Sequence, residues 1–317
     1  MARLDLRKQV LAADMNIASP AYHRADKGVI LPPVNDDGYI PALLDIVKAN
    51  QVGLLVPLTD LDLRLLAASR DEFARLGCTA MIGSKHAVGQ CEDKAQTNDL
   101  LKRAGLPLIR TLALDHFLAK PFYPCFVKPA RGSAGVGAQR IENDQELRAH
   151  VAAFGLDLLV QDYVPGQEYT LDVYRSRSGQ VHCVVPRQRL AVRSGEVEKG
   201  ITVHDEPLIQ SGLKLAEALD GLWGVFCCQC RRSSSQPSQP PRFFEINPRF
   251  GGGAPLSIAA GVDLPLYLLQ EVLGLPITAR FGEFTDRLLM LRYDESVFVQ
   301  LEGRPESLPG FQTPTFR

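Results

Sequence analysis

Apolar and polar positions in the first 80 residues follow two alternating patterns. Short apolar runs at 8–14, 28–31 and 53–57 predict buried strands. Segments 39–50 and 61–76 have the spacing of amphipathic helices instead. Strands that alternate with helices of these lengths predict a parallel α/β layer, which ends near Ile82.

The start of this layer differs from that of a usual nucleotide-binding domain. A doubly wound domain opens with a strand and a Gly-rich turn, whereas this chain begins almost directly on what corresponds to a second strand. We therefore expect residues 1–84 to form a shortened Rossmann-like domain without its first βα unit. Either the start is truncated, or the domain is a reduced version that binds nothing itself.

The middle of the chain mixes helices with strands. The expected elements are a helix at 85–104, a strand at 123–129, a loop at 130–137, a helix at 143–154, and strands at 158–164 and 168–175. Pro165 and Gly166 favour a turn that makes the last two strands antiparallel. This pattern predicts an α+β part over 85–275 with a flexible lid at about 110–160.

The remaining segments are simpler. The Ser/Gln/Pro-rich stretch 233–241 is too polar to pack, so we expect an exposed loop between antiparallel strands at 225–231 and 242–246. We expect residues 276–317 to form a C-terminal closing segment with a strand at 287–299.

Charge and composition exclude several classes of protein. The 35 Lys and Arg nearly balance the 36 Asp and Glu, so no global field attracts nucleic acid or an anionic membrane. The sequence has neither a signal-peptide h-region in its first fifteen residues nor an apolar run long enough to span a bilayer. Seven cysteines, an odd number, predict a reduced cytoplasmic protein, and Cys227, Cys228 and Cys230 lack the second ligand pair of a zinc site.

The segment 126–137 has the composition of a phosphate-binding loop. Lys128 ends an apolar strand, and Pro129 keeps the chain extended after it. Gly132, Gly135 and Gly137 let backbone NH groups approach an oxyanion. The segment is neither a Walker A loop nor the dinucleotide fingerprint. A solvent loop with turn glycines is the alternative, which Lys128 and Pro129 make less favourable.

The segment 243–250 offers oxygen ligands for a hard cation. Glu245 and Asn247 lie two apart on one predicted strand and therefore face the same side. Gln229, on the partner strand, would add a third oxygen, and Mg²⁺ prefers such donors. The alternative is a surface strand ending in an Asx-Pro turn, but the apolar residues around Glu245 argue against full exposure.

The order of these motifs resembles the ATP-grasp superfamily, and within it the large subunit of carbamoyl-phosphate synthase. The matching segments are Glu92-Asp-Lys94 with Gly105-Leu-Pro107, Val127-Lys-Pro129 with its glycine loop, residues 160–169, and residues 244–249. The resemblance covers roughly residues 10–295. It implies an ATP-grasp fold preceded by a shortened pre-ATP-grasp domain.

The resemblance also implies a nucleotide site with magnesium. Lys94 and Lys128 would contact the ATP phosphates, and Glu168 the ribose hydroxyls. The flap over the phosphates would contain Arg131, Gly132, Ser133, Ala134, Gly135 and Gly137, and the hinge beside adenine Gln161, Asp162, Tyr163 and Val164. Gln229, Glu245 and Asn247 would hold Mg²⁺, with Mn²⁺ as an alternative.

In such enzymes ATP phosphorylates a carboxylate, and an amine or similar nucleophile attacks the acyl phosphate. Arg249 and Lys128 are the expected catalytic residues, and Gly251 and Gly252 would border the substrate. Further substrate candidates are Arg187, Arg189, Arg193 and Lys199, for which a solvated basic stretch is the alternative.

One ATP-grasp unit cannot carry out both phosphorylations of carbamoyl-phosphate synthesis. We therefore expect a stand-alone cytoplasmic carboxylate–amine ligase that acts on small molecules and allows a homodimer. A non-catalytic Mg-ATP-binding module is the main alternative, motivated by the missing βα unit and by Gln229 at a metal position. A biotin-carboxylase-like enzyme is disfavoured, because that relative is longer and works with a carrier domain.

Overall fold

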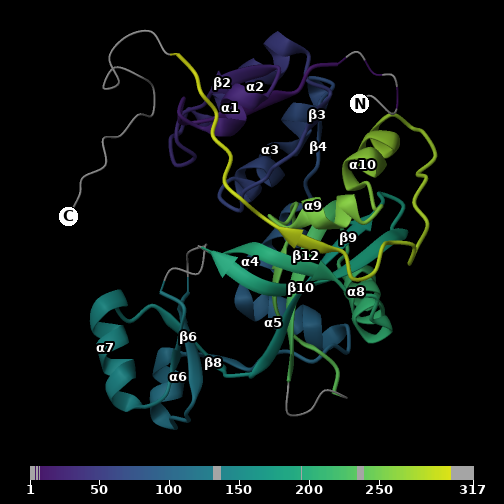
Figure 1. Ribbon diagram of the computed structural model, residues 1–317. Coiled ribbons are helices and arrows are strands. Elements are labelled where there is room, and N and C mark those ends of the chain that lie inside the picture. Colours follow the sequence, from purple (N-terminus) through teal and green to yellow (C-terminus); the bar gives the residue numbers. More distant parts are fainter. Residues whose placement is uncertain are drawn as a thin grey trace.

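The chain folds into three parts in the computed structural model shown in Figure 1. The structure describes residues 8–130, 137–193, 195–233 and 239–300, together with Leu4 and Leu6. An N-terminal layer lies above a central sheet, and a small lid stands to one side of it (Figure 1). Within these residues, no helix combines the length and apolarity needed to cross a membrane.

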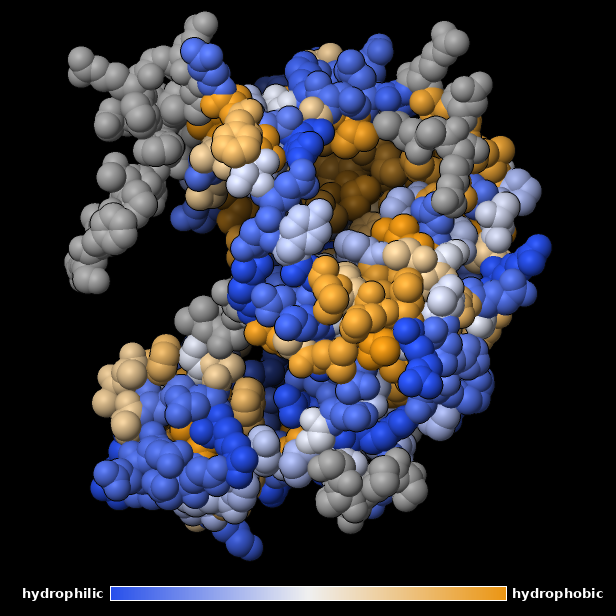
Figure 2. All heavy atoms as spheres, viewed as in Figure 1, coloured by the Kyte–Doolittle hydropathy of each residue, from blue (hydrophilic) through white to orange (hydrophobic). Residues whose placement is uncertain are grey.

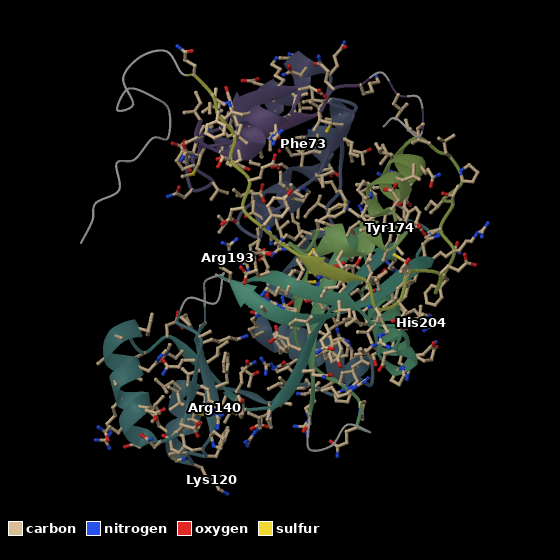
Figure 3. All side chains as sticks on the ribbon, in the orientation of Figure 1. Phe73, Lys120, Arg140, Tyr174, Arg193 and His204 are labelled. Atoms are coloured by element: carbon tan, nitrogen blue, oxygen red, sulfur yellow. The ribbon has the colours of Figure 1, made fainter. Side chains whose placement is uncertain are left out.

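The N-terminal layer is the predicted parallel α/β unit. It contains β1 (Leu11–Asp14), α1 (Pro20–Arg24), β2 (Lys27–Ile30), α2 (Tyr39–Asn50), β3 (Leu54–Leu55), α3 (Leu63–Arg75) and β4 (Thr79–Ala80). β1 pairs with β2 and β3 with β4, both in parallel, as two separate two-stranded sheets. Leu43 and Val47 of α2 pack with Leu66 and Phe73 of α3 in one core, as helical spacing of apolar residues requires. Figure 3 labels Phe73 there.

The prediction of a single helix at 85–104 is wrong in one respect, because two helices occupy this segment. They are α4 (Lys85–Glu92) and α5 (Lys94–Arg103). Asp93 is extended, with φ −83° and ψ 118°, and its carboxylate accepts a hydrogen bond from the Gln96 amide at 3.0 Å. This N-cap begins a new helix and makes Lys94 its first residue.

The lid is a four-stranded antiparallel sheet with two helices. Its elements are β5 (Thr111–Ala113), α6 (Leu114–Ala119), β6 (Cys125–Pro129), β7 (Gln139–Ile141), α7 (Asp144–Phe154) and β8 (Leu158–Asp162), with strand order β5-β8-β6-β7. It has a core of its own, to which Phe117, Val127 and Val160 belong. The lid therefore holds Lys128 on a separately packed unit.

The central sheet has six strands in the order β13-β12-β9-β10-β11-β14. These are β9 (Gly166–Arg175), β10 (Val181–Arg193), β11 (Glu196–Thr202), β12 (Gly224–Ser233), β13 (Arg242–Asn247) and β14 (Leu289–Leu291), joined by α8 (Glu206–Ala218), α9 (Ala254–Ala259) and α10 (Leu264–Val272). Leu215 of α8 packs with Leu171 and Phe226 in one core. Leu264 of α10 packs with Tyr174 in another, so helices cover both faces of the sheet.

Two expectations about strands are wrong, and one is confirmed. The strands around Pro165 and Gly166 do not form a hairpin, because β8 pairs with β5 and β6 in the lid while β9 lies between β10 and β12. The strand expected at 287–299 is limited to β14, which pairs with β11. β12 and β13 are antiparallel as predicted; residues 234–238 of their connection lie outside the described residues.

Candidate active site

Most of the predicted site residues lie around one cleft where the three parts meet. Those lining it are Lys94, Lys128, Gln161, Asp162, Tyr163, Val164, Glu168, Arg187, Arg189, Gln229, Glu245, Asn247, Arg249, Gly251 and Gly252. Figure 2 shows a hollow between the N-terminal layer and α10 with apolar residues inside it. Leu54, Val56, Leu269 and Val272 line this apolar part of the cleft.

A few predicted residues lie elsewhere. Arg193, near the tip of the β10–β11 hairpin (Figure 3), borders a smaller cavity and forms an ion pair with Asp294 at 2.7 Å. Lys199 lies opposite Leu291 of β14, away from the residues that line the cleft. Gly137 packs beside Pro129 and Phe154 with φ +69°. Arg131, Gly132, Ser133, Ala134 and Gly135 lie outside the described residues.

Three oxygen-bearing side chains come together on β12 and β13. Gln229 pairs with Glu245 in the antiparallel register, and Asn247 donates a hydrogen bond to Glu245 Oε1 at 3.1 Å. Across the described part of the chain, no three His, Cys, Asp or Glu side chains gather into a metal site. One carboxylate with two amides suits Mg²⁺, which takes its remaining ligands from phosphates and water. The donor set therefore fits the predicted cation.

Lys128 is a partly buried cation at the end of β6. Burial and, to a smaller extent, the charge of Lys94 lower the pKa of Lys128 to about 8, although Glu245 acts in the opposite direction. Its Nζ lies 5.9 Å from the centre of the Phe244 ring, so this lysine of the lid lies close to β13, which carries Glu245 and Asn247. Two neighbouring lysines at a partly desolvated position are suited to a polyanion such as triphosphate.

ATP affinity should therefore depend on pH through Lys128. As pH rises through about 8, Lys128 of the free protein loses its charge. Bound phosphates favour the charged form, so affinity should fall by up to roughly tenfold per pH unit above that value. Titration calorimetry with MgATP between pH 7 and 9.5 measures this fall. Lys128→Arg should remove the dependence, because arginine stays charged; a wild-type affinity that is flat above pH 8 would contradict the assignment.

Side chains of the predicted adenine hinge are held by local contacts. Gln161 donates to the Thr111 hydroxyl at 2.8 Å, and Asp162 pairs with Arg110 at 2.6 Å. The guanidinium of Arg140 lies 4.3 Å from the centre of the Tyr163 ring. These three side chains are therefore engaged in contacts within the protein.

Glu168, the predicted ribose ligand, lies between two arginines. Arg231 donates to Glu168 Oε2 at 2.7 Å, and Arg189 lies 3.2 Å from Oε1. Arg189 also has a buried Nε without a hydrogen-bond partner. Glu168 thus fixes both cations at the cleft wall, and one of them keeps an unused donor.

Asp60 also lines the cleft, although it was not among the predicted site residues. Arg249 Nε donates to Asp60 Oδ1 at 2.8 Å, and its Nη2 contacts Asp60 Oδ2. Asp60 follows β3 at the carboxyl end of that strand, where parallel α/β layers place ligand-contacting residues. That position is the signal that could have found it. The pair connects the N-terminal layer to the loop after β13.

Arg187 lies under the cleft floor in a buried ion pair. It donates to both oxygens of Asp172, at 2.7 and 2.8 Å, and the two side chains are 1% and 0% exposed. Ser257 donates to Asp172 Oδ2 at 2.5 Å. A Cβ on Gly253 would come within 2.0 Å of Arg187 Nη1, so the loop at 251–253 packs directly on this pair only because it lacks side chains.

Family models and named relatives match parts of the chain. Three family models match: "ATP-grasp in the biosynthetic pathway with Ter operon" over residues 155–293, a PylC-like N-terminal domain over 2–82, and the D-ala D-ala ligase C-terminus over 99–192. A D-alanine–D-alanine ligase from Alcanivorax borkumensis is 39% identical over 84 residues, 26% of this chain and 27% of that protein. One from Anaplasma marginale (strain Florida) is 29% identical over 158 residues, 44% of this chain and 47% of that protein. The matches thus span less than half of these relatives.

Solved structures share the fold at low identity. Biotin carboxylase from Campylobacter jejuni has a TM-score of 0.67 at 17% identity, covering 85% of this chain and 66% of that one. N5-carboxyaminoimidazole ribonucleotide synthetase from Thermus thermophilus has a TM-score of 0.66 at 19% identity, covering 88% and 75%. L-amino acid ligase from Bacillus licheniformis has a TM-score of 0.62 at 18% identity, covering 82% and 66%.

The fold and the motifs in the cleft define a protein of the ATP-grasp type. The family models, which together reach from the N-terminal layer to β14, agree on this class. These matches confirm the resemblance to the ATP-grasp superfamily, and the solved structures share the fold that this resemblance implies.

Proposed function

We propose that the protein is an ATP-dependent carboxylate–amine ligase that forms a C–N bond through an acyl phosphate and releases ADP and phosphate. The observation that carries this proposal is the meeting of Lys128 from the lid with the Gln229–Glu245 pair of the central sheet in a cleft that also contains Arg249. The D-alanine–D-alanine ligases among the relatives, and the L-amino acid ligase among the structures, support this reaction class.

In this proposal, a different set of cleft residues would bind each part of MgATP. Lys94 and Lys128 would face the phosphates, the backbone of residues 161–164 the adenine, and Glu168 the ribose. Gln229, Glu245 and Asn247 would hold Mg²⁺ or Mn²⁺. When bound, the cation would neutralise charge that develops on the phosphates.

Phosphoryl transfer to a carboxylate requires positioning and charge neutralisation more than covalent help from the protein. Arg249 has a planar guanidinium suited to a carboxylate or a phosphoryl group. Asp60 holds it in place with two contacts. In the proposed reaction a substrate oxygen takes the γ-phosphoryl group, with Arg249 beside the acyl phosphate, and the amine then displaces phosphate.

Phosphate release with a panel of acids and amines tests the proposal. The twenty standard amino acids and D-alanine, supplied singly and in pairs with MgATP, should include at least one combination with turnover. Lys128→Ala, which removes a cation from the proposed phosphate site, should lower that turnover at least about 100-fold. If no combination exceeds the Lys128→Ala background, the ligase assignment fails.

A Mg-ATP-binding module without catalysis is the second candidate. It is favoured by Gln229, a neutral side chain at a proposed metal position, and by the engagement of Glu168 with two arginines. Tight MgATP binding without any turnover, and without any effect of Glu245→Gln on activity, would support this candidate.

The compartment and assembly remain proposals as well. All seven cysteines are free and buried, and burial raises the pKa of the Cys91 and Cys227 thiols to about 12. Such protonated thiols suit the reduced cytoplasm. A homodimer is proposed by analogy with a biotin carboxylase domain described as a dimer.

A further inference from the structure

The carboxylate of Glu196 faces the cleft beside the glycine loop that follows Arg249. It is the first residue of β11, its side chain is exposed, and it lines the cleft together with Arg249 and Gly252. A Cβ on Gly252 would lie 1.6 Å from Glu196 Oε2 and 3.0 Å from Oε1. The carboxylate therefore occupies space that a side chain at position 252 would fill, and it reaches the residues that border the proposed acyl phosphate.

The charges around Glu196 differ from those elsewhere in the cleft. Arg249 pairs with Asp60, Arg187 with Asp172, and Arg189 with Glu168. No described side chain forms an ion pair with Glu196, although its charge acts on both the Arg187 and the Arg249 guanidinium. A glutamate at a hairpin end is often merely solvated. Here, however, the carboxylate lies against the glycine loop and faces the cleft.

An unpaired carboxylate at this position has a definite preference among ligands. It repels a phosphoryl group or a second carboxylate and attracts a cation. Of the groups that a carboxylate–amine ligase handles, apart from the metal, the amine substrate is the one that arrives with a positive charge. Lys94 and Lys128 carry the positive charge that suits the phosphates of ATP. Glu196 carries the negative charge that suits the amine substrate.

We propose, on the basis of the ligase function proposed above, that Glu196 forms the subsite for the ammonium group of the amine substrate. The ammonium donates hydrogen bonds to the carboxylate and gives one proton to it. The nitrogen lone pair then forms the C–N bond to the acyl carbon, while the C–O bond to the phosphoryl group breaks and its electrons leave with phosphate. The second proton of the nitrogen passes to water, which yields a neutral amide and a protonated Glu196 that releases its proton to solvent. The substrate class is thus a primary amine that is charged near neutral pH, such as an amino acid.

Glu196→Gln tests this subsite when two nucleophiles are compared. The acid is the one that gives turnover in the amino-acid panel, and the nucleophile is either its amino-acid partner or hydroxylamine, which is neutral at pH 7.5. For the amino acid, KM should rise roughly 10- to 100-fold with loss of a charge-assisted contact. Hydroxamate formation and the KM for ATP should stay within about twofold, because neither needs an ammonium site.

Two further variants separate the subsite from structural effects. Glu198→Gln makes the same change two residues along β11. Both glutamates border the smaller cavity beside Arg193, but only Glu196 also lines the cleft, so Glu198→Gln should leave both nucleophiles unaffected. Gly252→Ala should displace the Glu196 carboxylate and reproduce the defect that is specific to the amino acid.

The results of these experiments separate failure of the ammonium subsite from failure of the proposed ligase function. If the wild type forms neither peptide nor hydroxamate with any acid, the ligase proposal falls and this inference with it. If the wild type is active but Glu196→Gln leaves the KM of the amine unchanged, or impairs hydroxylamine equally, the ammonium subsite is wrong while the ligase proposal stands.

Discussion

Replacement of Glu245 by glutamine is expected to lower kcat by about 10²- to 10³-fold at saturating ATP. Glu245 contributes a carboxylate to the three proposed cation ligands, and it also faces the partly buried charge of Lys128. The amide keeps the shape of the side chain but removes the charge that would hold the cation against the phosphates. Steady-state phosphate release over a range of Mg²⁺ concentrations measures the effect.

A matched control is available on the surface. Glu217 is exposed on α8 and is not among the residues that line the cleft, so Glu217→Gln should have wild-type kcat. Since partial loss of cation affinity is expected, a higher Mg²⁺ concentration should restore part of the activity of Glu245→Gln. A Glu245→Gln protein with kcat within threefold of wild type would show that this strand does not hold the catalytic cation.

Asp172→Asn is expected to reduce the free energy of unfolding by about 3–5 kcal/mol. Asp172 and Arg187 are both fully buried in neighbouring strands of the central sheet, and Asp172 neutralises the guanidinium through two hydrogen bonds. Asparagine leaves the Arg187 charge buried without a counter-ion, which costs more than the loss of a single hydrogen bond. Urea unfolding followed by the fluorescence of Trp223, the only tryptophan, measures the change.

Ser257→Ala is the control with which the loss of stability in Asp172→Asn is compared. It removes one hydrogen bond to Asp172 and leaves the ion pair intact, so the expected loss is about 1 kcal/mol. Equal losses in the two variants would mean that Asp172 acts as an ordinary hydrogen-bond acceptor.

The parts of the site that the sequence predicted are those determined by local periodicity. The alternation of a strand places Glu245 and Asn247 on one face, and a polar connection between two apolar runs brings Gln229 opposite Glu245. The apolar spacing of 39–50 likewise predicts α2 with its observed bounds. Such features need no information beyond neighbouring residues, because period and turn signals act over a few positions.

The parts that it missed depend on partners far away in the chain. Asp60 lies 189 residues before Arg249, so their ion pair follows only from the packing of the N-terminal layer on the central sheet. Pro165 and Gly166 lie between β8 and β9 or at the start of β9, but a turn signal does not say which sheet takes the next strand. Glu196 can be recognised as a candidate for the site only from its contact with Gly252, which lies 56 positions later in the chain.

Transfer of oxygen from a labelled carboxylate tests the central claim most directly. The reaction is run with the acid that gives turnover, labelled with ¹⁸O in both carboxylate oxygens, and the released phosphate is analysed by mass spectrometry. An acyl phosphate requires one carboxylate oxygen to become bonded to phosphorus and to leave with it, so each phosphate should carry one ¹⁸O. Phosphate without ¹⁸O, formed together with the amide, would contradict activation of the carboxylate by phosphorylation.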